Sequence, residues 1–429
     1  MFQGRRAESQ RKNTELPMAI GDIEAVVLSH AHIDHSGRLP FLVREGYRKT
    51  IWSTPATRDL CALMLADSAH IQQKDAEHLA RHHRSSIAPL YDQTDVEETM
   101  KLMTAVPYGR EFEVIPGVRA TFLDAGHILG SAIVVLDCEE GGVRRRLAYS
   151  GDLGRSGQPI IGDPQIPKAV DRVILESTYG NRTHSPLADM QEALAEIVRE
   201  TAARGGRILI PAFAVGRTQE ILYDLHALLR EQRIPELPIY VDSPLAIDAT
   251  GVFSMHTEVF DQTERMVRDV RDLFDFRLVH YTRDVEESKA LNNLRGPMII
   301  IAASGMVESG RILHHLAHGA SDPRNTILIV GFQAEHTLGR RIVERQPVLR
   351  VFDEQVPLRA EVRVLNGYSA HADRNELEAW LTATAAVALE RPRVWLVHGE
   401  AEAQDGLAGT LREHGFDVAV PNPGETVTL

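Results

Sequence analysis

The chain has 429 residues, a length beyond which one hydrophobic core usually stops growing, so we expect two domains. Its 43% hydrophobic and 25% charged residues are ordinary for globular proteins and exclude a disordered or fibrous protein. The formal net charge of −13 counts against a protein that binds nucleic acid through a generally basic surface, although a metal site can supply local positive charge.

The sequence carries no signal for export or for membrane insertion. No apolar run reaches the length of a membrane helix, and residues 1–13 are polar and basic with no apolar stretch behind them. Cys61 and Cys138 lie far apart and outside any C-x-x-C pattern, which favours free buried thiols. These features predict a cytoplasmic protein with no membrane partner.

Several short β-branched segments end at an ionisable residue. Residues 23–29 have the pattern of a buried strand and run directly into the sequence HAHIDH at 30–35. Three later segments end in the same way, namely 146–150 before Asp152, 171–175 before Glu176 and 393–397 before His398. Because sheet-based enzymes gather their sites at strand ends, these residues are predicted to share one site.

The middle of the chain alternates between strand and helix patterns. The predicted strands are 206–211, 238–242, 297–302 and 325–330, and 218–229 has helical periodicity. Such alternation is typical of a parallel α/β sheet. We therefore predict an inserted domain at 183–364 and a discontinuous outer domain formed by 1–182 and 365–429.

The segment HAHIDH is the strongest local signal for chemistry. Three imidazoles and a carboxylate suit a metal such as zinc better than they suit a solvated loop. One loop cannot surround an ion, so the hypothesis requires ligands at other strand ends, and His127, Asp152 and His398 meet that requirement. Each of these alone would be read as a hydrogen-bonded structural residue.

Taken together, these residues resemble a known family. The pattern His30-x-His32-x-Asp34-His35 is similar to the metal motif of the metallo-β-lactamase superfamily. The segments ESTYGNR at 176–182, GYSAHAD at 367–373 and VHGE at 397–400 resemble the additional motifs of its β-CASP branch. The resemblance covers almost the whole chain and is stronger to the compact ribonucleases related to the cleavage and polyadenylation endonuclease than to ribonuclease J.

The resemblance implies a fold and a reaction. The fold would be an αββα sandwich with an inserted parallel-sheet β-CASP domain. The reaction would be hydrolysis of phosphodiester bonds in single-stranded RNA by a hydroxide that bridges two zinc ions, although such sites also accept manganese or iron. The metal ligands would be His30, His32, Asp34, His35, His127, Asp152 and His398.

The resemblance also implies roles for residues outside the ligand set. The resemblance places Asp34 among both the metal ligands and the catalytic residues. It also implies that His371 is the general acid and that Glu176 orients the His371 imidazole. Ser369 would contribute to a phosphate cradle, and Arg217 and Arg311 would contact the RNA backbone. Without the resemblance, Glu176 would be read as a surface carboxylate, His371 as a helix-entry residue, and either arginine as solvated.

Two further expectations concern other parts of the chain. His82, His83, His314 and His315 lie in helical patterns without companion ligands and are predicted to be surface histidines. Family members have strands before the segment that corresponds to residues 1–4, which suggests that amino-terminal strands are missing and that the recorded start is internal. Lost strands would remove a residue that braces the ligands and weaken metal binding.

Three alternatives to a ribonuclease remain open. Another hydrolase of the superfamily would share the metal motifs but lack the inserted domain. A DNA-processing nuclease differs in the third additional motif, where RNA-cutting members carry the histidine seen here as His398. The last alternative is an RNA-binding subunit impaired by its missing amino terminus. The sequence leaves a homodimer open as well.

Overall fold

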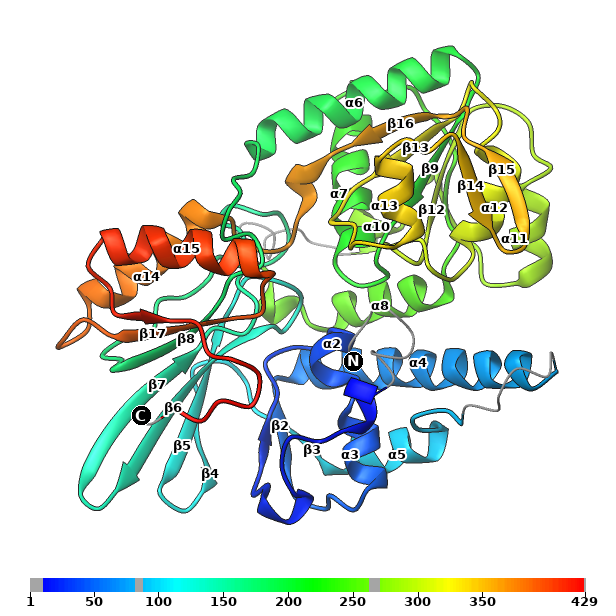
Figure 1. Ribbon diagram of the computed structural model, residues 1–429. Coiled ribbons are helices and arrows are strands. Elements are labelled where there is room, and N and C mark those ends of the chain that lie inside the picture. The colour runs from blue at the N-terminus through cyan, green and yellow to red at the C-terminus, as the bar shows by residue number, and fades with distance from the viewer. Residues whose placement is uncertain (1–10, 82–87, 262–270, 428–429) are drawn as a thin grey trace. The chain divides into compact units, whose positions relative to one another are not determined.

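The computed structural model describes residues 11–81, 88–261 and 271–427 (Figure 1). The chain divides into two compact units. Unit 1 comprises Met1–Thr183 and His371–Leu429, and unit 2 comprises His184–Ala370. Residues 1–4, on which the expectation of missing strands rests, and the pair His82 and His83 lie outside the described residues. Across the described ranges, no helix is both long enough and apolar enough to cross a membrane.

Unit 1 contains a seven-stranded and a three-stranded sheet. The large sheet has the order β18-β17-β8-β7-β6-β5-β4; its strands β4 to β7 pair antiparallel, and β7, β8, β17 and β18 pair parallel. The small sheet is parallel, with the order β1-β2-β3. The strands are β1 (Val26–Val27), β2 (Ile51–Ser53), β3 (Met103–Ala105), β4 (Glu111–Ile115), β5 (Val118–Asp124), β6 (Ala132–Glu140), β7 (Val143–Tyr149), β8 (Arg172–Glu176), β17 (Arg393–Val397) and β18 (Val418–Ala419).

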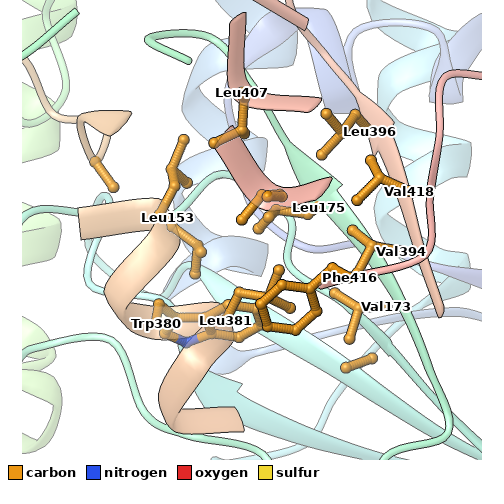
Figure 2. Packing of buried hydrophobic residues seen from close by; sticks show 14 of the residues in the cluster. Leu153, Val173, Leu175, Trp380, Leu381, Val394, Leu396, Leu407, Phe416 and Val418 are labelled. Carbon is orange, nitrogen blue, oxygen red and sulfur yellow. The ribbon is translucent and has the colours of Figure 1, made fainter. Parts of the chain in front are cut away.

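The two faces of the large sheet are covered differently. Figure 2 shows the first face, where Leu381 of α14 and Leu407 of α15 pack with Val173 and Leu396 of the sheet. Burying each such leucine contributes roughly 1.5–3 kcal/mol. On the second face, the ring of Phe112 packs against Trp52 of the small sheet, with ring centroids 4.8 Å apart and the ring planes tilted by 37°. The helices of this unit are η1 (Ile20–Asp22), α2 (Ile33–Ser36), α3 (Leu39–Arg44), α4 (Pro55–Arg81), α5 (Gln93–Leu102), α14 (Arg374–Ala386) and α15 (Ala401–Glu413).

Unit 2 is built on a six-stranded sheet in which every strand pair is parallel. Its order is β11-β10-β12-β9-β13-β16, and a separate antiparallel hairpin is formed by β14 and β15. Every residue of β12 and β13 is buried, as expected for strands covered on both faces. The strands are β9 (Arg207–Pro211), β10 (Ile239–Val241), β11 (Val279–Tyr281), β12 (Met298–Ala302), β13 (Thr326–Ile329), β14 (Val348–Val351), β15 (Glu354–Pro357) and β16 (Glu361–Val364).

The helices of unit 2 precede, connect and follow its strands. They are α6 (Leu187–Ala203), α7 (Arg217–Arg230), α8 (Pro244–Met255), η2 (Thr257–Val259), α10 (Arg271–Phe274), α11 (Val285–Leu291), α12 (Ile312–Gly319), α13 (Leu338–Val343) and η3 (Asn366–Tyr368). The predicted α/β class, with a sandwich and a parallel-sheet unit, is therefore confirmed. One strand is much shorter than predicted, since only Val26–Val27 of the segment 23–29 pair with a neighbour.

Candidate metal centre

The segment HAHIDH follows β1 and forms the entry to helix α2. His30 is fully buried, and the Ser29 hydroxyl lies 3.1 Å from its Nδ1. His32 is the residue before the helix, and Asp34 and His35 lie in its single turn. A short helix directly after a strand therefore directs four polar side chains of one loop toward the same end of the sheets.

The other candidate ligands follow three strands of the large sheet. His127 lies after β5 and Asp152 after β7, and both are buried. Their loops touch through backbone, because a Cβ at Gly154 would stand 1.6 Å from the Gly126 carbonyl oxygen. Any side chain at position 154 would therefore push His127 and Asp152 apart.

His398 follows β17 in an unusual backbone conformation. Its φ of 54° is in the left-handed region that residues other than glycine rarely adopt. Two residues after β8 hold it there: the Ser177 hydroxyl donates to the Val397 carbonyl at 2.7 Å, and the Thr178 hydroxyl lies 3.1 Å from His398 Nδ1. The Thr178 contact orients the ring, and both ring nitrogens of His398 lie near other candidate ligands.

The first group of candidate ligands has the spacing of a zinc site. Two ligand atoms on one tetrahedral zinc, each about 2.0–2.1 Å from the ion, are about 3.3–3.4 Å apart. Here His32 Nδ1 and His127 Nε2 are 3.1 Å apart, and Asp152 Oδ2 lies 3.5 Å from His30 Nε2 and 3.6 Å from His127 Nε2. The four side chains His30, His32, His127 and Asp152 can therefore share one ion.

A second group lies beside the first. His398 Nε2 is 3.2 Å from His35 Nε2 and 3.5 Å from Asp34 Oδ2, so these three residues also converge. Asp152 Oδ2 is 3.4 Å from His35 Nε2, and Asp152 Oδ1 is 3.5 Å from His398 Nδ1. Asp152 thus stands between the two groups, as a bridging carboxylate must.

The hydrogen bonding and protonation of the buried candidate ligand atoms are also those expected of metal ligands. His30 Nε2 and Asp152 Oδ1 are buried without a hydrogen-bond partner among the described residues. Such atoms are costly to bury unless a cation satisfies them. Burial lowers the pKa of His32 to about 4 and holds the pKa of His30 well below 6.5, so both imidazoles are neutral at pH 7 and can present a lone pair.

A third group joins His371 and Glu176 to the centre. Glu176 ends β8 with its side chain fully buried, and its Oε1 accepts from the Leu153 amide at 2.7 Å. His371 Nδ1 lies 3.1 Å from Glu176 Oε1 and 3.9 Å from Asp152 Oδ2. Burial alone would lower the pKa of His371, but the Glu176 carboxylate outweighs it and raises that pKa.

The backbone that follows His371 is fixed within unit 1. The Ala372 amide donates to the Leu153 carbonyl at 2.7 Å, and Asp373 caps α14 in a reciprocal pair of hydrogen bonds with Glu376. All candidate ligands, together with Glu176 and His371, therefore lie in one unit and within contact of one another. Thr178 and Ser29, which contact candidate ligand imidazoles, were given no role from the sequence, although Thr178 lies in the ESTYGNR motif and Ser29 directly precedes HAHIDH.

The three residues predicted to contact RNA lie in unit 2. Ser369 is buried. Arg217 is only 6% exposed, pairs with Glu220 and lies 5.7 Å over the ring of Tyr368. The Arg311 guanidinium donates to Asp242 at 2.6 Å and to the Arg283 carbonyl at 2.7 Å. Both guanidinium groups thus have partners inside unit 2, and their predicted roles at RNA remain predictions.

The expectation that His315 is a surface histidine is wrong. It is 1% exposed, its Nε2 lies 2.7 Å from Asp242 Oδ2, and its Nδ1 lies 3.0 Å from Asn292 Oδ1. The neighbouring His314 is exposed as predicted. The two positions differ because adjacent residues on a helix point about 100° apart, and only one of them faces the sheet.

Replacing Asp242 by asparagine is expected to destabilise unit 2 by about 3–5 kcal/mol, because Arg311 and His315 would lose a buried partner. Chemical denaturation of the variant measures this loss. Burial alone would raise the pKa of Asp242, but hydrogen bonds from His315, Ser288 and Arg311 outweigh it and lower that pKa below 3.8. The stabilisation by the charged carboxylate is therefore complete above pH 4 and is lost as the pH falls through the folded-state pKa.

The matched control is Asp248→Asn. Asp248 also pairs with an arginine of unit 2, Arg283, but both side chains are exposed. Exposed pairs contribute less than about 1 kcal/mol. Equal destabilisation by the two changes would contradict a buried network around Asp242.

Comparison with protein families accounts for most of the chain. Residues 6–197 match the metallo-β-lactamase superfamily, residues 218–342 match the β-CASP domain, and residues 355–421 match the Zn-dependent metallo-hydrolase RNA specificity domain. The first match contains all candidate ligands except His398, which lies in the third.

Several relatives match over nearly the whole chain. Ribonuclease TTHA0252 of Thermus thermophilus is 39% identical over 430 residues, which cover 100% of this chain and 93% of that protein. Transcription termination factor FttA of Pyrococcus abyssi is 33% identical over 95% of this chain, but the chain spans only 62% of the factor's length. An RNase J-like protein of Methanocaldococcus jannaschii is 30% identical over 84% of this chain and 78% of its own length. With its sandwich, its inserted parallel sheet and its cluster of ligands, the chain belongs to the β-CASP branch of the metallo-β-lactamase superfamily.

Proposed function

We propose that this protein is a metal-dependent ribonuclease that hydrolyses phosphodiester bonds in single-stranded RNA. The observation that carries the proposal is the arrangement of six other candidate ligands around Asp152, with the His371–Glu176 pair beside them. The 39% identity to ribonuclease TTHA0252 supports RNA as the substrate. The presence of His398 in the third additional motif favours RNA over DNA.

The donor set fits two zinc ions. His30, His32 and His127 would hold one ion, and Asp34, His35 and His398 the other, with Asp152 shared. Imidazole and carboxylate ligands at this spacing suit zinc, and manganese or iron are the alternatives to be tested. When bound, the ions would lower the pKa of a water molecule and offset negative charge on the phosphate oxygens.

Two side chains of the protein, His371 and Glu176, would provide the proton for the leaving oxygen. Because His371 Nδ1 faces the carboxylate of Glu176, the imidazole is oriented to donate a proton from Nε2. The raised pKa of His371 favours the protonated form that a general acid requires. Glu176 is itself fixed by the amides of Leu153 and Thr178, so it acts as a positioning residue for His371.

Unit 2 is proposed to correspond to the inserted β-CASP domain, for which the sequence predicted the range 183–364. Its parallel sheet and the match over residues 218–342 support this assignment. We propose that Ser369 and the two arginines Arg217 and Arg311 act at the RNA backbone, either by direct contact or by shaping the segments that make it.

The test compares RNA and DNA as substrates of the same protein. End-labelled single-stranded RNA and DNA of identical sequence are incubated with protein treated with a chelator and then resupplied with zinc or manganese. We expect cleavage of RNA only, lost on chelation and restored by metal. Equal cleavage of DNA would favour a DNA-processing nuclease. Two bound metals without cleavage of either polymer would indicate a different ester substrate.

A further inference from the structure

Unit 2 contains a polar pocket of about 380 Å³ at the amino-terminal ends of its central strands. In open parallel sheets, ligands ordinarily bind at the carboxyl-terminal ends of the strands. This pocket lies where β9, β12 and β13 begin, so the usual site of the fold does not account for it. Its lining residues are Gly205, Arg207, Asn292, Leu294, Arg295, Gly296, His318, Asp322, Arg324 and Asn325.

Arg207 links two segments of the pocket lining. Its guanidinium donates to the carbonyl oxygens of Leu291 and Asn292 at 3.3 Å and also to that of Leu294. Its own amide donates to Asn325 Oδ1 at 2.8 Å. These bonds tie the loop at 291–296 to the start of β9, and the loop is thereby held in a defined position.

The pocket carries an excess of positive charge. Three arginines and one carboxylate line it, which gives a formal charge of +2 in a chain of −13. The carboxylate, Asp322, is already paired with Arg324 through two hydrogen bonds of 3.1 and 2.7 Å. Asp322 therefore interacts mainly with Arg324 and more weakly with Arg207, and no ion pair within the described ranges joins it to Arg295.

Several donors face the pocket without a partner. Within the described ranges, the Arg295 guanidinium has no hydrogen bond or ion pair, and Arg324 uses Nε and Nη2 but not Nη1. Asn292 Oδ1 is occupied by His315, so its amide NH₂ is the group left to donate. Guanidinium and amide donors that converge on one concave site match the oxygens of a phosphate group.

We propose that this pocket binds a phosphate-bearing ligand, with Arg295 and Arg324 as its phosphate contacts. The volume is within the range of small-molecule sites and can hold a mononucleotide. The phosphate can belong to a free nucleotide or to the end of an RNA strand. The pocket involves none of the metal ligands, so the proposal does not depend on the ribonuclease assignment.

Isothermal titration calorimetry of the full chain with adenosine monophosphate tests the proposal. The wild type is compared with Arg295→Glu and with Arg324→Ala, and Arg350→Ala, which alters an arginine exposed on the hairpin, is the matched control. Binding at the metal centre is common to all four proteins, so any difference between them reports on the pocket. We expect the pocket affinity to weaken about tenfold or more in the first two variants and to be unchanged in the control.

Further titrations identify the source of the phosphate. Inorganic phosphate, adenosine and a short RNA with a 5′-phosphate are titrated under the same conditions. Binding of the RNA but not of adenosine monophosphate supports a phosphate site for the end of an RNA strand. Binding of adenosine monophosphate as well supports a phosphate site that accepts a free nucleotide. Identical binding by all four proteins, or adenosine binding as tightly as adenosine monophosphate, overturns the proposal. Because Arg295 is exposed, thermal unfolding of Arg295→Glu should match that of the wild type.

Discussion

Asp152→Asn is expected to leave the protein with little bound metal and to reduce RNA cleavage by at least about 100-fold. Removing a residue that only hydrogen-bonds a metal ligand already lowers metal affinity or activity by about 10–100-fold, so removing a ligand should cost at least as much. Asp152 Oδ2 lies within 3.4–3.6 Å of ring nitrogens of His30, His35 and His127. An amide keeps the size of the side chain but offers only one neutral oxygen. Both groups of ligands therefore lose the negatively charged carboxylate that they share.

Metal content per chain and the initial rate of RNA cleavage measure this effect together. Asp137→Asn is the matched control, because Asp137 is a buried aspartate of the same sheet that pairs with Arg146 at 2.8 Å and lies in none of the ligand groups. The control should lose stability but keep its metal. Full metal content and normal cleavage by Asp152→Asn would refute the shared role of this carboxylate.

His371→Ala is expected to lower the rate of cleavage by about 10²–10⁴-fold, the range for removal of a general acid, while metal content stays at the wild-type level. The reason is that His371 belongs to the group with Asp152 and Glu176 and to neither of the two groups that contain the candidate ligands of the HAHIDH segment. His70→Ala, which alters an exposed histidine of α4, serves as control.

A companion variant separates catalysis from positioning. Glu176→Gln keeps an oxygen that can accept from the Leu153 amide but removes the charge facing His371 Nδ1. We expect kcat to fall with little change in KM. Because the pKa of His371 falls without the Glu176 charge, the alkaline limb of the activity profile, where His371 loses its proton, should move toward lower pH. A loss of metal in His371→Ala would instead identify His371 as a ligand and contradict its assignment as general acid.

The sequence was most informative where the signal is local. The six residues HAHIDH predict a metal centre by themselves, because so many imidazoles and carboxylates in one loop are costly to satisfy without an ion. The four strands β9, β10, β12 and β13 of unit 2 were also predicted close to their observed bounds, since a buried strand is a short, continuous apolar run, whereas β11 and β16 were not predicted. The antiparallel strands β4 to β6 were not identified, although β5 leads into the loop that carries the predicted ligand His127.

Only the tertiary structure decides which polar side chains are satisfied within the protein. The sequence named Arg217 and Arg311 as RNA contacts and His315 as a surface residue, but their partners Glu220, Tyr368 and Asp242 are presented by other turns, helices and strands. The pocket around Arg207 and Arg295 likewise arises from three strand starts that are far apart in the sequence. Periodicity fixes the face that a residue occupies on its own element, whereas its partner is determined by the order of the strands in the sheet, and that order is set by packing over the whole unit.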